Sequence, residues 1–112
     1  MSEFGKMLKS LRIEKKISQR KLAELVGIDF TYISKIESGT MDPPSESTII
    51  KMAEVLGENP DKMIIAAKKV PSDIQKVITE HEDVAAFLRQ VPKLSTKQWE
   101  EIRRITEKKD DD

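Results

Sequence analysis

The stretch SQRKLAELVGIDFTYISKIESG, residues 18–39, predicts two short helices joined by a tight turn. Ser18 is a residue type that caps helix N-termini. The apolar residues that follow it have the spacing of one helix face: Leu22, Ala23, Leu25 and Val26. Gly27 can end this first helix, because a residue without a Cβ readily adopts the positive φ that a helix C-terminus often needs.

The second helix of the stretch offers polar groups on the faces opposite its expected buried side. Asp29 can cap it, Ile33 and Ile36 would be buried, and Gly39 ends it. Its other faces carry residues that can reach base edges and phosphates: Phe30, Thr31, Tyr32, Ser34, Lys35 and Ser38. Two capped helices of about two turns, with a glycine in the connection, have the composition of a helix-turn-helix.

These residues resemble the repressor/Cro-type (XRE) helix-turn-helix family of transcriptional regulators. The likeness is carried by Gln19, Ala23, Gly27, Ile33, SKIESG at 34–39, PS at 44–45 and TIIKMAEVLG at 48–57. It covers roughly residues 4–66 and implies an all-α fold, with a five-helix lambda-repressor-like DNA-binding domain. One departure is the loop 40–44, which is a residue longer than usual in the family and has Asp42 where many relatives carry a basic residue.

The resemblance also implies a role for individual residues, with double-stranded DNA as the partner. In the major groove, the residues expected at base edges are Thr31, Tyr32 and Lys35, with Ser38 on the same helix. Phe30 would pack either on a thymine methyl group or on the domain itself. The residues expected to hold phosphates are Gln19, Arg20 and Ser34. Arg12 and Glu37 match a family ion pair that ties the first helix to the recognition helix, and are expected to be structural.

Composition restricts the class of protein. The 112 residues leave room for one compact domain and an appendage. The sequence has no Cys, which excludes disulfides and cysteine metal sites, and no apolar run approaches the roughly 18 residues of a membrane helix. No signal-peptide core is present in the first residues. We therefore expect a soluble, cytoplasmic protein that does not insert into membranes and needs no cofactor or metal.

Charge is unevenly distributed, although the formal net charge is zero. Residues 1–40 carry eight Lys and Arg against five acidic residues, whereas residues 70–112 carry eight against ten. A modestly basic half beside an acidic half is compatible with DNA binding through a local face. It also predicts weak non-specific affinity, because few phosphates would be neutralised.

The rest of the first 69 residues predicts three more helices around the helix-turn-helix. A first helix over 3–16 has an apolar side made of Phe4, Met7, Leu8 and Leu11, with lysines on its wet side. After the proline-containing loop 40–44, Ser45 or Ser47 caps a helix that runs to Leu56. Asn59 and Pro60 begin a fifth helix. We assign residues 1–69 to the DNA-binding domain.

Residues 70–112 predict a helical extension with apolar faces that need a partner. The first two short faces are Ile74, Val77 and Ile78, then Val84, Phe87, Leu88 and Val91. Ser95 and Gln98 form a capping box that opens a last helix from Thr96 to about residue 108, followed by an acidic tail expected to be disordered. The last helix has a stripe of Trp99, Ile102 and Ile105. Phe87, Leu88 and this stripe are candidate contacts, either within the chain or across a homodimer.

The leading interpretation is a sequence-specific transcriptional repressor that binds an inverted-repeat operator as a homodimer. The alternative is an antitoxin-type protein-binding module, which would neutralise a partner protein through residues 70–109 and regulate its own operon. An enzyme is rejected, because the sequence has no nucleophile–base pair and no Gly-rich phosphate loop. The single histidine, His81, is interpreted as part of a connector between helices rather than as a metal ligand.

Overall fold

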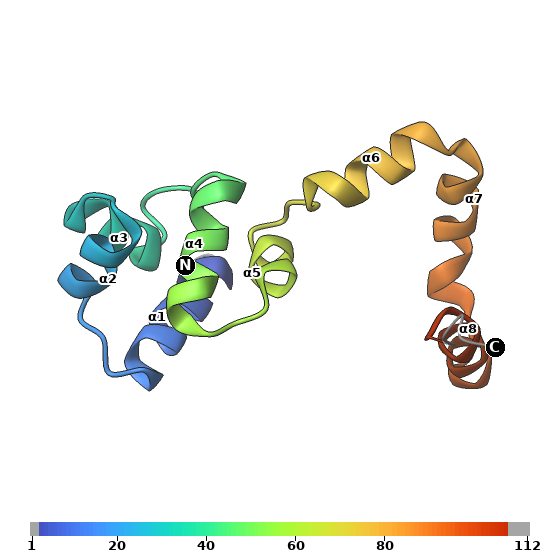
Figure 1. Cartoon of the computed structure of the whole chain (residues 1–112), viewed down its shortest axis with the longest axis horizontal. Coiled ribbons are helices and arrows are strands. Elements are labelled where there is room, and N and C mark those ends of the chain that lie inside the picture. The colour runs from blue at the N-terminus through green and yellow to red at the C-terminus, as the bar shows by residue number, and fades with distance from the viewer. Residues whose placement is uncertain (1–2, 108–112) are drawn as a thin grey trace. The chain divides into compact units, whose positions relative to one another are not determined.

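The structure, a computed structural model, describes residues 3–107, and all regular elements in this range are helical (Figure 1). The all-α class expected from the sequence is confirmed. The chain divides into two compact units, Met1–Ser72 and Asp73–Asp112, which are described separately.

The first unit contains five α-helices. They are α1 (Glu3–Glu14), α2 (Gln19–Val26), α3 (Phe30–Ser38), α4 (Glu46–Leu56) and α5 (Pro60–Ala66). Helix α3 packs against α1 and α2, while α4 packs against α2 and α5, and α1 closes the arrangement on α5. The recognition helix expected from the sequence is therefore held between the first helix of the chain and the first helix of the helix-turn-helix.

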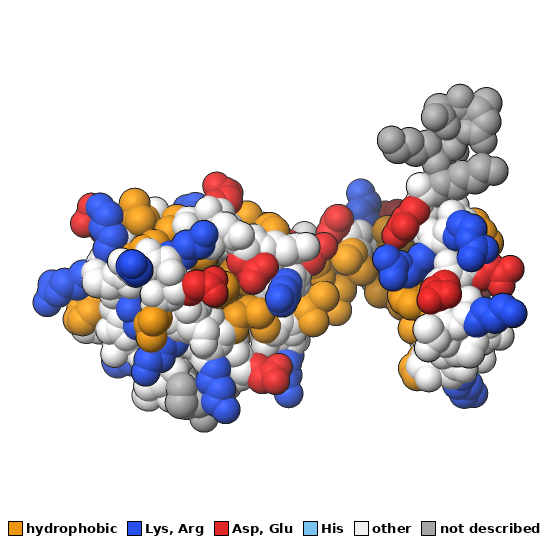
Figure 2. Space-filling view, turned by 90° about the horizontal axis from the view of Figure 1, so that it is seen from below, with side chains coloured by type: hydrophobic (Ala, Val, Ile, Leu, Met, Phe, Trp, Pro, Cys, Tyr) orange, Lys and Arg blue, Asp and Glu red, His pale blue; other side chains and the backbone are white. Residues whose placement is uncertain are grey.

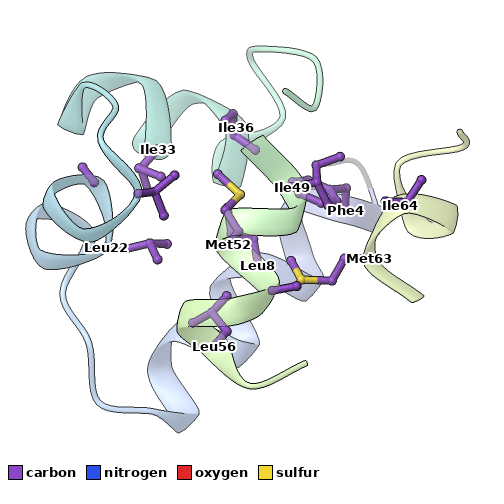
Figure 3. Packing of buried hydrophobic residues seen from close by; sticks show 13 residues of the cluster. Phe4, Leu8, Leu22, Ile33, Ile36, Ile49, Met52, Leu56, Met63 and Ile64 are labelled. Atoms are coloured by element: carbon purple, nitrogen blue, oxygen red, sulfur yellow. The ribbon is translucent and has the colours of Figure 1, made fainter. Parts of the chain in front are cut away.

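All five helices contribute side chains to one apolar core (Figure 3). Its largest fully buried members are Phe4, Leu8, Leu22, Ile33, Ile36, Ile49, Met52, Leu56, Met63 and Ile64. Burial of each such side chain contributes about 1.5–3 kcal/mol relative to exposure. The core lies entirely within residues 4–64, so this unit buries its apolar surface without help from the second.

Local signals set the helix boundaries as expected. The side chain of Ser18 accepts a hydrogen bond from Lys21 N, and that of Asp29 accepts one from Thr31 N. Gly27 has φ +85°, which reverses the chain between α2 and α3. Of the two serines considered for α4, Ser45 is the cap.

Two expectations for these helices were wrong. Helix α1 ends at Glu14 rather than at residue 16, because Lys16 adopts φ +58° and Ile17 N returns a hydrogen bond to Arg12 O at 3.0 Å. Leu25 was expected on the buried face, yet 49% of it is exposed. The face that is buried is centred on Leu22 and Val26, and the 100° turn per residue carries Leu25 beyond its edge.

The first unit ends three residues beyond the boundary expected from the sequence. Pro71 is buried, and Ser72 donates two hydrogen bonds to the carboxylate of Glu46, from N at 3.1 Å and from Oγ at 2.9 Å. These contacts join residues 71–72 to the N-terminus of α4.

The second unit consists of short helices that bury almost nothing among themselves. They are α6 (Ser72–Glu80), α7 (Glu82–Gln90), the 3₁₀ turn η1 (Val91–Lys93) and α8 (Thr96–Glu107). The capping box is confirmed, since Gln98 N donates to Ser95 Oγ at 3.1 Å and Ser95 N donates to Gln98 Oε1 at 2.9 Å. None of the described side chains of these four elements is buried. The acidic tail expected to be disordered lies outside the described residues.

Candidate nucleic-acid interface

Helix α3 presents one buried face and one exposed face. Ile33 and Ile36 are fully buried in the core, and Glu37 is only 3% exposed. Thr31, Lys35 and Ser38 are exposed. Because residues four and three positions apart stack on a helix surface, these three form a continuous polar strip. The buried face fixes the helix on the domain, and the strip remains available to a ligand.

Glu37 is the centre of a hydrogen-bond network that joins three helices. Arg12 Nε and Nη2 donate to the two carboxylate oxygens of Glu37 at 2.7 and 3.0 Å, a bidentate pair. Gln19 Nε2 donates to Oε1 at 3.0 Å, and Arg12 Nη1 donates to Ile17 O at 2.9 Å. The network fixes α3 relative to α1 and to the start of α2, and it engages the amide of Gln19 that the sequence assigned to phosphate.

The polar strip contains groups whose hydrogen-bonding capacity differs. The side chain of Lys35 makes no hydrogen bond or ion pair with any described residue, so its ammonium group is available. Thr31 Oγ1 donates to Asp29 Oδ1 at 3.1 Å, which leaves its lone pairs and its methyl group. Ser38 Oγ donates to Lys35 O at 3.1 Å and lies 2.8 Å from Thr40 Oγ1. Ser38 therefore has a local role at the end of α3.

The two aromatic side chains of α3 are partly committed to the fold. Phe30 and Tyr32 are half-buried and pack against the edge of the core. The guanidinium carbon of Arg20 lies 4.6 Å from the centroid of the Phe30 ring, within the range of a cation–π interaction. Of the two possibilities for Phe30, packing on the domain is therefore present in the structure.

A hollow of about 300 Å³ lies beside α3 and is lined by Lys9, Gln19, Ser34, Glu37 and Ser38. Its donors are the ammonium group of Lys9, the amide of Gln19 and the hydroxyl of Ser34, since the Ser38 hydroxyl already donates to Lys35 O. The carboxylate of Glu37 within the hollow is already paired with Arg12. Such a set of donors suits a phosphate. Sequence reasoning named Gln19, Ser34 and Ser38 but not Lys9, which it treated as one of several lysines on a wet face.

The position of Lys9 near α3 could have been inferred from the sequence. Lys9 and Arg12 are three positions apart and so lie on the same face of α1. Since Arg12 reaches Glu37 on α3, Lys9 must lie near the same helix.

The candidate contact residues of the second unit are exposed or half-buried. Phe87, Leu88, Trp99 and Ile105 are exposed, and Ile102 is half-buried. His81 lies between α6 and α7, with no metal-binding group of His, Cys, Asp or Glu side chains around it in the described residues. Within residues 3–107, no helix is both long and apolar enough to cross a bilayer.

The helical order, the glycine turn between α2 and α3 and the polar strip on α3 define a helix-turn-helix DNA-binding protein. Residues 8–63 match the helix-turn-helix family model, and the chain belongs to the XRE-type family of DNA-binding transcriptional regulators. Proteins of this family act by binding DNA and are not enzymes.

Two proteins of Bacillus subtilis (strain 168) are similar in sequence. The uncharacterized HTH-type transcriptional regulator RghRB is 29% identical over 113 residues, which span 91% of this chain and 81% of that protein. The HTH-type transcriptional repressor RghR is 41% identical over 56 residues, which span 50% of this chain and 42% of RghR. The stronger identity is thus confined to half of the chain.

Two solved structures have a similar fold. SinR, described as the master regulator for biofilm formation, in complex with DNA is 31% identical with a TM-score of 0.52, over 55% of this chain and 97% of that one. The SinR protein/SinI protein complex is 25% identical with a TM-score of 0.53, over 92% of this chain and 93% of that one. The helix-turn-helix fold expected from the sequence is confirmed.

Proposed function

We propose that this protein is a cytoplasmic transcriptional repressor that binds an inverted-repeat operator as a homodimer, with α3 in the major groove. The observation that carries the proposal is the polar strip of Thr31, Lys35 and Ser38, opposite the buried Ile33 and Ile36. A helix whose back is fixed in a core and whose front carries free donors and acceptors can enter the groove without reorganising. The repressor RghR and the DNA-bound SinR support this choice among regulators.

Base reading is assigned to the residues of α3 with free polar groups. Lys35 would donate to guanine O6 or N7, since its ammonium group has no partner in the described residues. Thr31 would accept from adenine N6 or cytosine N4, because its hydroxyl proton is directed to Asp29, or would contact a thymine methyl group. Tyr32 would contact a base through the exposed edge of its side chain.

Backbone contacts are assigned to the hollow beside α3 and to α2. Lys9, Gln19 and Ser34 line the hollow and would surround one phosphate. The free N–H groups at the start of α2 would add a favourable field. The basic side chains of the first unit are spread over the face shown in Figure 2 rather than gathered in one patch. Affinity for non-specific DNA should therefore be modest.

Dimerisation is assigned to the second unit. A unit of about 40 residues rarely folds alone without a disulfide, a metal or a partner, and here none of the described side chains of α7 and α8 is buried. Hydrophobic side chains are visible on the surface of this unit in Figure 2. Phe87, Leu88, Trp99, Ile102 and Ile105 would be covered by the same residues of a second copy, with Trp99 as an anchor.

The same exposed surface favours a second candidate, in which residues 70–109 bind a different protein, as in an antitoxin. The SinR/SinI complex is a similar structure in which a regulator is joined to another protein. The two candidates differ in which subunits the purified protein must contain. A homodimer is soluble and complete alone, whereas a protein-binding module needs the product of a second gene.

Selection of bound duplexes from a random DNA pool tests the proposed function. We expect enrichment of one sequence with two inverted halves whose centres are about one helical turn apart. Enrichment of no sequence by a folded protein would contradict sequence-specific binding. A single unrepeated half-site would contradict binding as a symmetric dimer.

A further inference from the structure

Arg20 and Phe30 form a contact that general docking of this fold does not require. Arg20 is the second residue of α2, and Phe30 is the first residue of α3. The Arg20 guanidinium carbon lies 4.6 Å from the Phe30 ring centroid. The pair therefore bridges the two helices of the helix-turn-helix at the ends from which both begin.

The guanidinium group of Arg20 is held against the Phe30 ring but has no hydrogen-bond partner. The Arg20 side chain makes no hydrogen bond or ion pair with any described residue. Glu24, one turn further along α2, pairs with Lys21 at 3.5 Å instead. Arg20 is also exposed, so its five N–H donors can all be offered to a ligand.

The ring that holds this group is itself fixed. Phe30 is half-buried and packs on the apolar core, and Asp29 caps α3 directly before it. A flexible arginine side chain normally loses much rotational freedom when it binds an anion. Contact with a fixed ring restricts that freedom in advance, which lowers the cost of binding.

We infer that Phe30 is a positioning residue that holds the Arg20 guanidinium as a bidentate clamp for one DNA backbone phosphate, and that Phe30 does not itself read a base. This inference rests on the proposed function. A phosphate is the favoured ligand because the first helix of a helix-turn-helix crosses the DNA backbone and Arg20 lies at the beginning of that helix. Planar guanidinium groups bind phosphate through two parallel hydrogen bonds.

A double-mutant cycle tests the inference, with the full-length chain, the selected operator and a scrambled duplex. Arg20→Ala should weaken binding to both duplexes by the same factor, about tenfold, and should reduce the salt slope of binding by about one. Phe30→Leu keeps an apolar side chain on the core but removes the ring. It should weaken binding about two- to fivefold when Arg20 is present and leave affinity unchanged in the Arg20→Ala background.

One further variant and a measurement of stability separate positioning from a structural role. Phe30→Tyr retains a ring and should bind DNA with the affinity and salt slope of the wild type. Thermal unfolding of all variants identifies any loss of stability, which a structural role would produce equally with and without Arg20. An equal effect of Phe30→Leu in both backgrounds would overturn the inference.

The outcomes also separate this inference from the proposed function. If Phe30→Leu changes the base preference at one position of the site, Phe30 reads a base. If Arg20→Ala changes it, the guanidinium binds guanine. Either result would overturn the phosphate clamp. A folded wild-type protein that binds neither duplex would overturn the proposed function and the inference together.

Discussion

Glu37 shows how a single residue connects sequence, fold and function. Its carboxylate is almost completely buried, and three donors from Arg12 and Gln19 compensate for the loss of water. Burial of an unpaired charge is costly, so the network is stable only when its members are all present. Because the network fixes α3 on α1, the orientation of the polar strip depends on it.

Glu37→Ala should therefore reduce stability strongly. Loss of one partner leaves the Arg12 guanidinium, only 12% exposed, without its counter-charge, which costs up to about 3–5 kcal/mol. Thermal and urea unfolding of Glu37→Ala and Arg12→Ala should show similar large losses. Glu24→Ala is the matched control, since it removes only an exposed pair with Lys21 and should cost less than about 1 kcal/mol. A loss no larger for Glu37→Ala than for Glu24→Ala would exclude the structural role.

Thr31 and Lys35 should behave in the opposite way. Both are exposed, so Thr31→Ala and Lys35→Ala should leave the free energy of unfolding almost unchanged. Each should weaken operator binding by about 1–3 kcal/mol and relax preference at one base pair. Titrations against operator and scrambled duplexes measure this difference. Lys62→Ala, which removes a positive charge from an exposed position on α5, is the control. Unchanged specificity in both α3 variants would mean that another face of the domain reads the DNA.

At the level of the helices, the turn between α2 and α3 depends on Gly27. A Cβ at Gly27 would have no atom within 4 Å, so a substitution is opposed by the φ of +85° and not by lack of space. Gly27→Ala should cost about 1 kcal/mol in the free energy of unfolding. Gly27→Asn should cost less, because Asn tolerates this conformation better. Equal stability of wild type and Gly27→Ala in urea would show that the turn relaxes to a negative φ.

Helix boundaries could be predicted from the sequence where they depend on neighbouring residues. Ser18, Asp29 and Asn59 are caps because their side chains reach backbone N–H groups two or three positions away. The early end of α1 could not be predicted, since it depends on a lysine at positive φ, which is uncommon for residues other than glycine.

The contacts within the candidate interface depend on packing between helices. The Arg12–Glu37 pair was expected only from the family resemblance, because the two residues are 25 positions apart. The hydrogen bond from Gln19 to Glu37 and the contact of Arg20 with Phe30 were not foreseen. Both form between side chains whose distance is set only when α1, α2 and α3 pack together.

The two units of the molecule differ in how much apolar surface they bury. The first unit contains the whole core, whereas in the second unit Trp99, Phe87 and Leu88 are all exposed, Trp99 by 43%. Surface of this kind usually marks an interaction site. One recognition helix reads about half of a site, and a second unit that pairs two copies would place two such helices on the same duplex.

Sedimentation of the protein on a duplex that carries the selected inverted repeat tests this arrangement most directly. We predict two full-length chains per duplex. The shortened protein that ends at Ser72 keeps the core and the Glu46–Ser72 contact, and we predict that one copy of it binds weakly to each half-site. One full-length chain per duplex, or two cooperatively bound copies of the shortened chain, would contradict dimerisation through the second unit.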